Sequence, residues 1–194
     1  MKLAVLMNQM INEEWFGKML ELEGRIFPVT GNDYLDPEYV RALYKDNQEG
    51  LFFCIDWDAC KLAGYLTVIF LDESQKERYL NGAHFSTLQN IGMHKGKNIL
   101  YIYTIAVDEE YRGSACMKLM GKAFAEWLDG KIKDGYEVSE VYAEAVSKEG
   151  ARSLHRGFGM TPMEDVDEDG RGHYFADDHL EGYIKKCDPA RGIG

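Results

Sequence analysis

One segment, residues 98–146, constrains the fold more than any other part of the chain. Residues 98–107 are apolar along almost their whole length, which is typical of a central strand covered on both faces. A turn follows, and then a helix is predicted over residues 114–131. The inward face of this helix takes five apolar residues: Met117, Met120, Phe124, Trp127 and Leu128. Residues 138–146 form the next predicted strand, and because strand, helix and strand make a βαβ unit, the two strands should be parallel neighbours.

The rest of the chain alternates helix-like and strand-like segments, which predicts an α/β or α+β domain. Apolar residues spaced by three and four predict a helix over 13–26 with Asn12 as its cap, and Pro37 opens a second helix. Residues 51–55 and 62–71 are rich in β-branched and aromatic residues and predict a hairpin. Further elements are expected as strands near 1–7, 160–163 and 180–186, and as a helix near 149–156.

Length, charge and cysteine count narrow the class of protein. The chain has 194 residues, so we expect one domain over 1–194, acting as a monomer or homodimer. No apolar run approaches the ~20 residues of a membrane span, and the N-terminus lacks the features of a signal peptide, so we expect a cytoplasmic protein without a membrane partner. The net charge of −11 argues against a nucleic-acid partner; it fits a cationic substrate or simple solubility. The four cysteines lack zinc-type spacing, so we expect free thiols and no metal.

The turn after the central strand has the features of an anion site. It reads Asp108-Glu109-Glu110-Tyr111-Arg112-Gly113-Ser114-Ala115-Cys116-Met117. A helix start leaves about four backbone N–H groups unpaired, and together with the helix dipole they attract an anion. Small residues at 113–115 let a phosphate reach these amides, and Arg112 adds a positive charge. Many βα turns share such a pattern, so the turn alone does not define a function.

In its context, this segment resembles the signature of the GNAT superfamily of N-acetyltransferases. That family has a strand ending in an apolar-x-Val pattern, a short acidic turn, and then Tyr-Arg-Gly-x-Gly-x-Gly. Here the strand, Tyr111, Arg112 and Gly113 match the pattern. Ala115 replaces a glycine, a mild change if the position has helical dihedral angles. Met117 replaces another small residue, and its side chain could press on a diphosphate or point into the core.

A second, independent match lies in the helix predicted near 149–156. The family typically reads Asn-x-x-Ala-x-x-Leu-Tyr-x-x-x-Gly-Phe there. Ala151, Leu154 and Gly159 align at the same spacing. Lys148 replaces the Asn, which in the family helps to order the turn beside the cofactor, and His155 replaces the Tyr, which often protonates the leaving CoA thiolate.

The resemblance implies a mixed, centrally splayed β-sheet of six to seven strands, flanked by about four helices. It implies acetyl-CoA as the acyl donor, and direct attack on the thioester by a primary amine of a small molecule or peptide, without a covalent enzyme intermediate. The pantetheine arm would lie along the backbone of Ile105, Ala106 and Val107, where the central strand splays away from the next strand. The diphosphate would lie on the amides of six residues: Arg112, Gly113, Ser114, Ala115, Cys116 and Met117.

Several residues are candidates for proton transfer in this reaction. His155 could protonate the thiolate, because histidine titrates near neutral pH. Glu140 and Glu144 share one face of their strand. We prefer Glu144 as the base, because it lies nearer the carboxyl end of the strand, where ligands bind in open α/β sheets. Tyr101 and Tyr103 could act instead through water, and ordinary packing or a surface role is the alternative for each of these residues.

Two other functions stay open from the sequence. The altered signature could mark a non-catalytic acyl-CoA sensor or interaction module on the same fold. A nucleotide could use the same helix start, although the chain has neither a Walker lysine pattern nor a Gly-x-Gly-x-x-Gly turn after its first strand. The sequence does not identify the acceptor. We expect its recognition to come from the N-terminal helices and from the polar stretch 72–97, which we interpret as a functional loop or a short helix.

Overall fold

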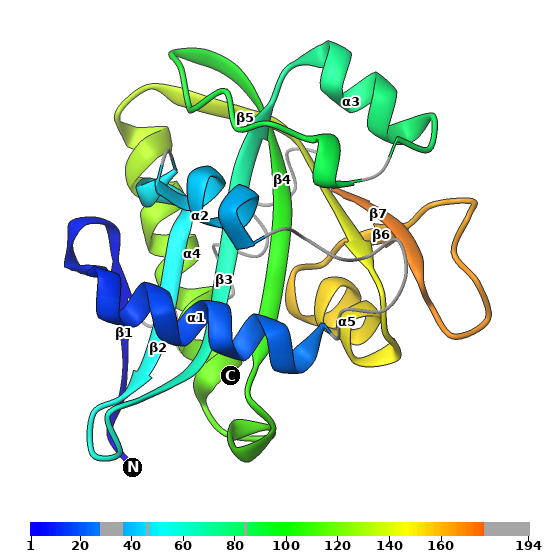
Figure 1. Cartoon of the computed structure of the whole chain (residues 1–194). Coiled ribbons are helices and arrows are strands. Elements are labelled where there is room, and N and C mark those ends of the chain that lie inside the picture. Colours follow the sequence, from blue (N-terminus) through cyan, green and yellow to red (C-terminus); the bar gives the residue numbers. More distant parts are fainter. Residues whose placement is uncertain (28–36, 46, 84, 177–194) are drawn as a thin grey trace, which may run out of the picture.

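Among the residues that the structure describes, seven strands form one mixed sheet in the order β1-β2-β3-β4-β5-β7-β6 (Figure 1). The computed structural model describes residues 1–27, 37–45, 47–83 and 85–176. The strands are β1 Leu3–Met7, β2 Leu51–Asp56, β3 Lys61–Leu71, β4 Gly96–Val107, β5 Tyr136–Ala145, β6 Thr161–Pro162 and β7 Gly172–Ala176. β4 and β5 pair in parallel, and every other neighbouring pair is antiparallel. The predictions of a mixed sheet with six to seven strands and of a parallel βαβ unit are therefore confirmed.

In the described ranges five α-helices accompany the sheet, and α1 and α2 cover one face while α4 covers the other (Figure 1). Their bounds are α1 Glu13–Ile26, α2 Pro37–Lys45, α3 Glu73–Leu80, α4 Cys116–Lys133 and α5 Lys148–Arg152. The predicted cap of α1 is confirmed, because the side-chain oxygen of Asn12 accepts a hydrogen bond from the amide of Trp15 at 3.1 Å. Asp72 caps α3 in the same way, accepting from the amide of Gln75 at 2.7 Å. The stretch that we interpreted as a loop or a short helix thus contains a short helix.

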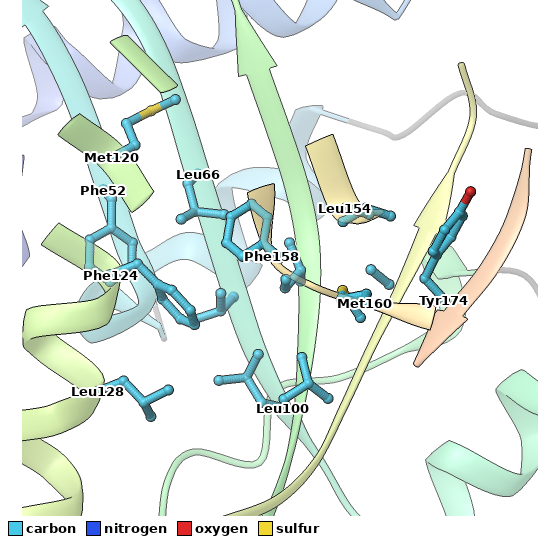
Figure 2. Packing of buried hydrophobic residues seen from close by; sticks show 14 of the residues in the cluster. Phe52, Leu66, Leu100, Met120, Phe124, Leu128, Leu154, Phe158, Met160 and Tyr174 are labelled. Carbon is cyan, nitrogen blue, oxygen red and sulfur yellow. The ribbon is translucent and has the colours of Figure 1, made fainter. Parts of the chain in front are cut away.

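The two faces of the sheet bury two separate cores. On the face that α4 covers, Phe124 of this helix belongs to one core with Phe52 and Phe158, and the ring centroids of Phe124 and Phe158 are 6.0 Å apart (Figure 2). The other core holds the apolar side of α1 and α2 together with a row of tyrosines on β3 and β4. Tyr65 and Tyr101 belong to this second core. The alternation of side chains along the strands assigns successive residues to opposite cores.

The C-terminal part of the described chain differs from the prediction in detail. The strand expected near 160–163 is confined to the two residues of β6, and β7 was not predicted at all. The strand expected near 180–186 lies outside the described residues. The helix expected near 149–156 is shorter than predicted: α5 ends at Arg152 and continues as a π-helical turn over Ser153–Gly157.

The pairing between β4 and β5 ends well before β4 does. The two strands pair from Gly96 opposite Tyr136 to Ile102 opposite Ala143. Beyond that point β4 runs on to Val107, and within the described part of the chain it pairs there only with β3. β5 meanwhile stays paired with β7 as far as Ala145 (Figure 1). The carboxyl ends of the two central strands therefore diverge, which is the splay expected from the family resemblance.

Candidate functional site

The turn between β4 and α4 is held rigidly by buried acidic groups. Asp108 is 8% exposed, and one of its carboxylate oxygens accepts from the Arg25 guanidinium at 2.7 Å. Its other oxygen accepts from the amide of Glu110 at 3.1 Å. The Tyr111 hydroxyl donates to Asp56 at 3.0 Å, and burial together with this contact raises the pKa of Tyr111 to about 12. Groups on α1 and β2 thus fix the turn that leads into the helix start.

The helix start presents amides that a phosphate can reach. Within the described part of the chain, the amides of Arg112 and Ser114 donate to carbonyls of the turn, whereas those of Gly113 and Ala115 have no backbone partner. Both of these residues are exposed, and a Cβ on Gly113 would meet nothing within 4 Å. Ala115 has φ −73° and ψ −1°, so it adopts the helical dihedral angles that alanine tolerates. The turn therefore fits the diphosphate that the sequence predicts there.

Two neighbouring side chains of this turn do not obstruct it. Met117 is partly buried and packs against the core beneath α4, so its side chain points inward. The Cys116 thiol is fully buried, and its contact with Cys54 together with burial raises its pKa far above the ordinary value of 9.0. Only the backbone of Cys116 can face a ligand, and its amide is 3.2 Å from the Ser114 hydroxyl oxygen, which accepts. The exposed Arg112 guanidinium pairs loosely with Glu109 at 3.7 Å.

Ile105, Ala106 and Val107 lie on the part of β4 that has left β5. On their other side they pair with Leu66, Tyr65 and Gly64 of β3, respectively. Ile105 and Val107 pack against the core beneath α4, while Ala106 belongs to the opposite core. Backbone groups on the open side of this stretch can pair with an extended amide-containing ligand, as a neighbouring strand would.

His155 lies in the π-helical turn after α5 and is exposed. Its Nδ1 is 3.0 Å from the carbonyl oxygen of Met160. Because a carbonyl only accepts, Nδ1 must carry the proton, which leaves Nε2 to exchange a proton with a ligand or solvent. The preceding residue, Leu154, is 3% exposed and anchors the turn in the core. Single π-helical turns often occur at functional sites.

The structure separates the two glutamates of β5. Glu140 accepts from Lys76 at 3.1 Å and from the Tyr142 hydroxyl at 3.0 Å, and it lies opposite Ile99, where β4 and β5 are still paired. Glu144 lies one residue beyond the last pair of that ladder and is half-buried. Of the two carboxylates, Glu144 is the one beside the splay.

A histidine and an aspartate that the sequence analysis did not select lie next to Glu144. His173 of β7 is directly opposite Glu144 in the β5–β7 ladder, and its Nδ1 is 2.5 Å from an Asp165 oxygen. The sequence contained a weak signal for this strand, namely the alternation of polar and apolar residues over 172–176. This short segment follows the acidic run 164–169, which is typical of a solvated loop, and the signal was missed.

Two classes of feature are not found among the described residues. No helix in the ranges given above is long and apolar enough to cross a membrane. In the same part of the chain, no group of three or more His, Cys, Asp or Glu side chains is arranged to hold a metal ion.

Comparison with known proteins places this geometry in a family. The sequence model of the acetyltransferase (GNAT) family matches residues 16–160. No curated protein matches the chain at a significant level. Among solved structures, an N-acetyltransferase from Staphylococcus aureus shares 13% identity at a TM-score of 0.58, over 92% of this chain and 99% of that one.

Two further solved structures have the same fold. NAA60 from Arabidopsis thaliana, solved with acetyl-CoA, shares 14% identity at a TM-score of 0.58, over 90% of this chain and 97% of that one. A mosquito arylalkylamine N-acetyltransferase-like protein shares 13% identity at a TM-score of 0.57, over 91% and 100%. At this low identity the likenesses show the fold, whereas the family model covers most of the chain, including the turn and the π-helical segment. The chain therefore belongs to the acetyltransferase (GNAT) family.

Proposed function

We propose that the protein transfers the acetyl group of acetyl-CoA to a primary amine of a small molecule or peptide by direct attack. The observation that carries this proposal is the end of β4–β5 pairing at Ile102 and Ala143. It leaves a free stretch of β4 backbone that leads directly into the exposed amides at the start of α4, with Glu144 just past the same point on β5. Donor-binding and proton-accepting groups thus adjoin one opening in the sheet.

The donor would be held mainly by backbone groups. The amides of Gly113 and Ala115 would receive the diphosphate, supported by the dipole of the 18-residue helix α4 and by the Arg112 side chain. The open edge of β4 at Ile105–Val107 would pair with the amides of the pantetheine arm. Backbone recognition explains why Ala115 and Met117 can replace signature residues without closing the site.

Two side chains would move the protons. An amine attacks only when it has lost its extra proton, and Glu144 would take that proton. The amine nitrogen then attacks the thioester carbonyl carbon, and as the C–S bond breaks this nitrogen loses its second proton. Nε2 of His155 would take up that proton and pass it to the departing sulfur, while its Nδ1–H stays bonded to the Met160 carbonyl. No enzyme nucleophile is needed, in keeping with the buried Cys116 thiol.

The acceptor would be cationic before it reacts. The net charge of −11 favours the approach of an ammonium group and disfavours nucleic acid as a partner. We place the donor and acceptor sites in one domain that comprises the whole chain.

One substitution tests the donor site with a matched control. Ala115→Glu puts a carboxylate where the diphosphate should lie, and it should not harm the fold, because this residue is exposed and an acid is favourable at a helix start. We expect the KM for acetyl-CoA to rise about tenfold or more, since like charges meet at short range. Ala115→Gln, equal in size but neutral, shares any steric effect of the longer side chain, so its KM should rise less than that of Ala115→Glu.

The assay measures release of the CoA thiol with a panel of amines, and calorimetry measures donor binding. Equal KM values for the two variants would refute the donor site. Donor binding without thiol release for any amine would support the sensor instead of the enzyme.

A further inference from the structure

Four titratable side chains beside Glu144 come together from four separate segments. Asp165 lies in the loop between β6 and β7, and its Oδ2 is 2.5 Å from Nδ1 of His173 on β7. The His173 ring meets the Tyr79 ring of α3 edge-on, with centroids 4.6 Å apart. Tyr79 in turn meets Tyr101 of β4 at 5.0 Å. The cluster therefore extends from the surface to the central strand at the splay.

The backbone fixes the His173–Asp165 pair in place. Gly172 has φ +134°, and a Cβ there would lie 2.9 Å from the Val166 Cα and 3.0 Å from the Asp165 carbonyl oxygen. This close approach, which only glycine allows, presses the loop against β7. The second Asp165 oxygen also accepts from the backbone amide of His173 at 3.4 Å. Asp165 is thus held against the imidazole from two sides.

His173 and Glu144 are cross-strand neighbours. They stand directly opposite each other in the antiparallel β5–β7 ladder, so their side chains share one face with Cβ atoms ~5 Å apart. Because Asp165 accepts the Nδ1–H, Nε2 is the nitrogen of His173 that can accept a proton. The side chain is 21% exposed, so the ring also reaches solvent.

The other groups facing His173 cannot take the proton themselves. Burial raises the pKa of Tyr79 and of Tyr101 well above the ordinary value of 10.0, and the charge of Glu144 adds to both shifts. Their hydroxyls therefore stay protonated at neutral pH. Lys76 of α3 is bonded to Glu73 and Glu140, away from this pair. Asp165 and Glu144 are the two carboxylates beside the ring.

The geometry points to His173, oriented by Asp165, as a positioning residue that receives the acceptor's proton from Glu144 and releases it to solvent. This inference rests on the proposed function. Glu144 gains a proton from the ammonium and passes it to Nε2 of His173, and the imidazolium then gives a proton to water. Glu144 returns to its carboxylate form, and no oxidant, reductant or further reactant is needed.

The test is chemical rescue of the His173→Gln variant. We expect kcat to fall about tenfold with the KM for acetyl-CoA unchanged, since His173 acts one step away from the substrate. Added imidazole should restore part of the rate, because a free base can take the proton from Glu144. The control is His94→Gln, since His94 is exposed and, among the described residues, only its backbone is bonded, through its amide and its carbonyl, both to the Asn98 side chain. This control should keep its rate and show no rescue.

A second measurement does not depend on turnover. Nitrogen NMR of labelled histidine should show His173 as the tautomer protonated at Nδ1 in the wild type, with that preference lost in Asp165→Asn. Three results would each overturn this inference and leave the proposed function intact. They are an unchanged kcat in His173→Gln, a fall in kcat that imidazole does not rescue although the variant melts like the wild type, and no tautomer preference at His173 in the wild type. A wild-type protein that transfers no acetyl group to any amine would overturn both.

Discussion

Replacing Glu23 with Gln should stabilise the protein at neutral pH, and the gain should vanish in acid. Glu23 lies on α1 and is 9% exposed, with its Oε2 buried and unpartnered among the described residues. Burial raises the pKa of this carboxyl from 4.5 to about 7, and the nearby Tyr65 hydroxyl offsets only part of the effect. At ~1.4 kcal/mol for each unit, this difference corresponds to about 3 kcal/mol.

The sign of the effect follows from proton binding. The native protein keeps the Glu23 proton up to about pH 7, whereas the unfolded chain loses it near pH 4.5. Between these values the native state binds more protons, so the free energy of unfolding falls as the pH rises. The stability contributed by the neutral carboxyl is fully present below pH 4.5 and is lost above about pH 7. Glutamine has no proton to lose and should escape this loss.

The assay is urea unfolding of both proteins at a series of pH values, with the free energy of unfolding taken from each transition. The difference between Glu23→Gln and wild type should grow from near zero at about pH 4 to about 3 kcal/mol at about pH 8. Glu21→Gln is the control, because Glu21 lies on the same helix but is exposed. A difference that stays constant with pH, or that Glu21→Gln reproduces, would refute the reasoning.

Three further predictions concern packing and the site. Gly64→Ala should lower the free energy of unfolding by about 1–3 kcal/mol, because the new Cβ would lie 2.6 Å from the Ala106 carbonyl oxygen. Gly17→Ala, whose Cβ would meet nothing within 4 Å, should raise the free energy of unfolding by up to ~1 kcal/mol. Urea unfolding measures both changes. Phe124→Ala should cost about 3–5 kcal/mol in the same assay, because the ring is fully buried among other aromatic rings. Asp108→Asn should loosen the turn and raise the KM for acetyl-CoA severalfold, and an unchanged KM would show that the turn needs no carboxylate.

The local elements of this fold are readable from the sequence because their signals are local. The apolar run at 98–107 is observed as the strand Gly96–Val107. The cap at Asn12 and the helix start at Pro37 also appear as predicted. α3 was less distinct, because it buries only Gln75 and Tyr79 and so lacks a clear apolar stripe.

The parts of the site that depend on long-range pairing could not be read in this way. β7 is five residues long and owes its place to pairing with β5, so neither its existence nor the position of His173 follows from local pattern. Whether the Met117 side chain points into the core or toward a ligand depends on how α4 packs against the sheet. The spacing of apolar residues along the helix does not determine this packing. The splay entered the prediction only through resemblance to a family, because no local signal marks where two strands part.

The early end of the β4–β5 ladder has a consequence for how the protein behaves in storage. Past Ile102, β4 has a partner strand on one side only among the residues that the structure describes, as an edge strand has. Edge strands offer unpaired backbone groups to any extended chain. Proteins commonly protect such edges with charged residues or proline, yet residues 103–107 contain neither. A ligand that pairs with this edge therefore also guards it against self-association, so concentrated solutions should keep better with donor present than without it.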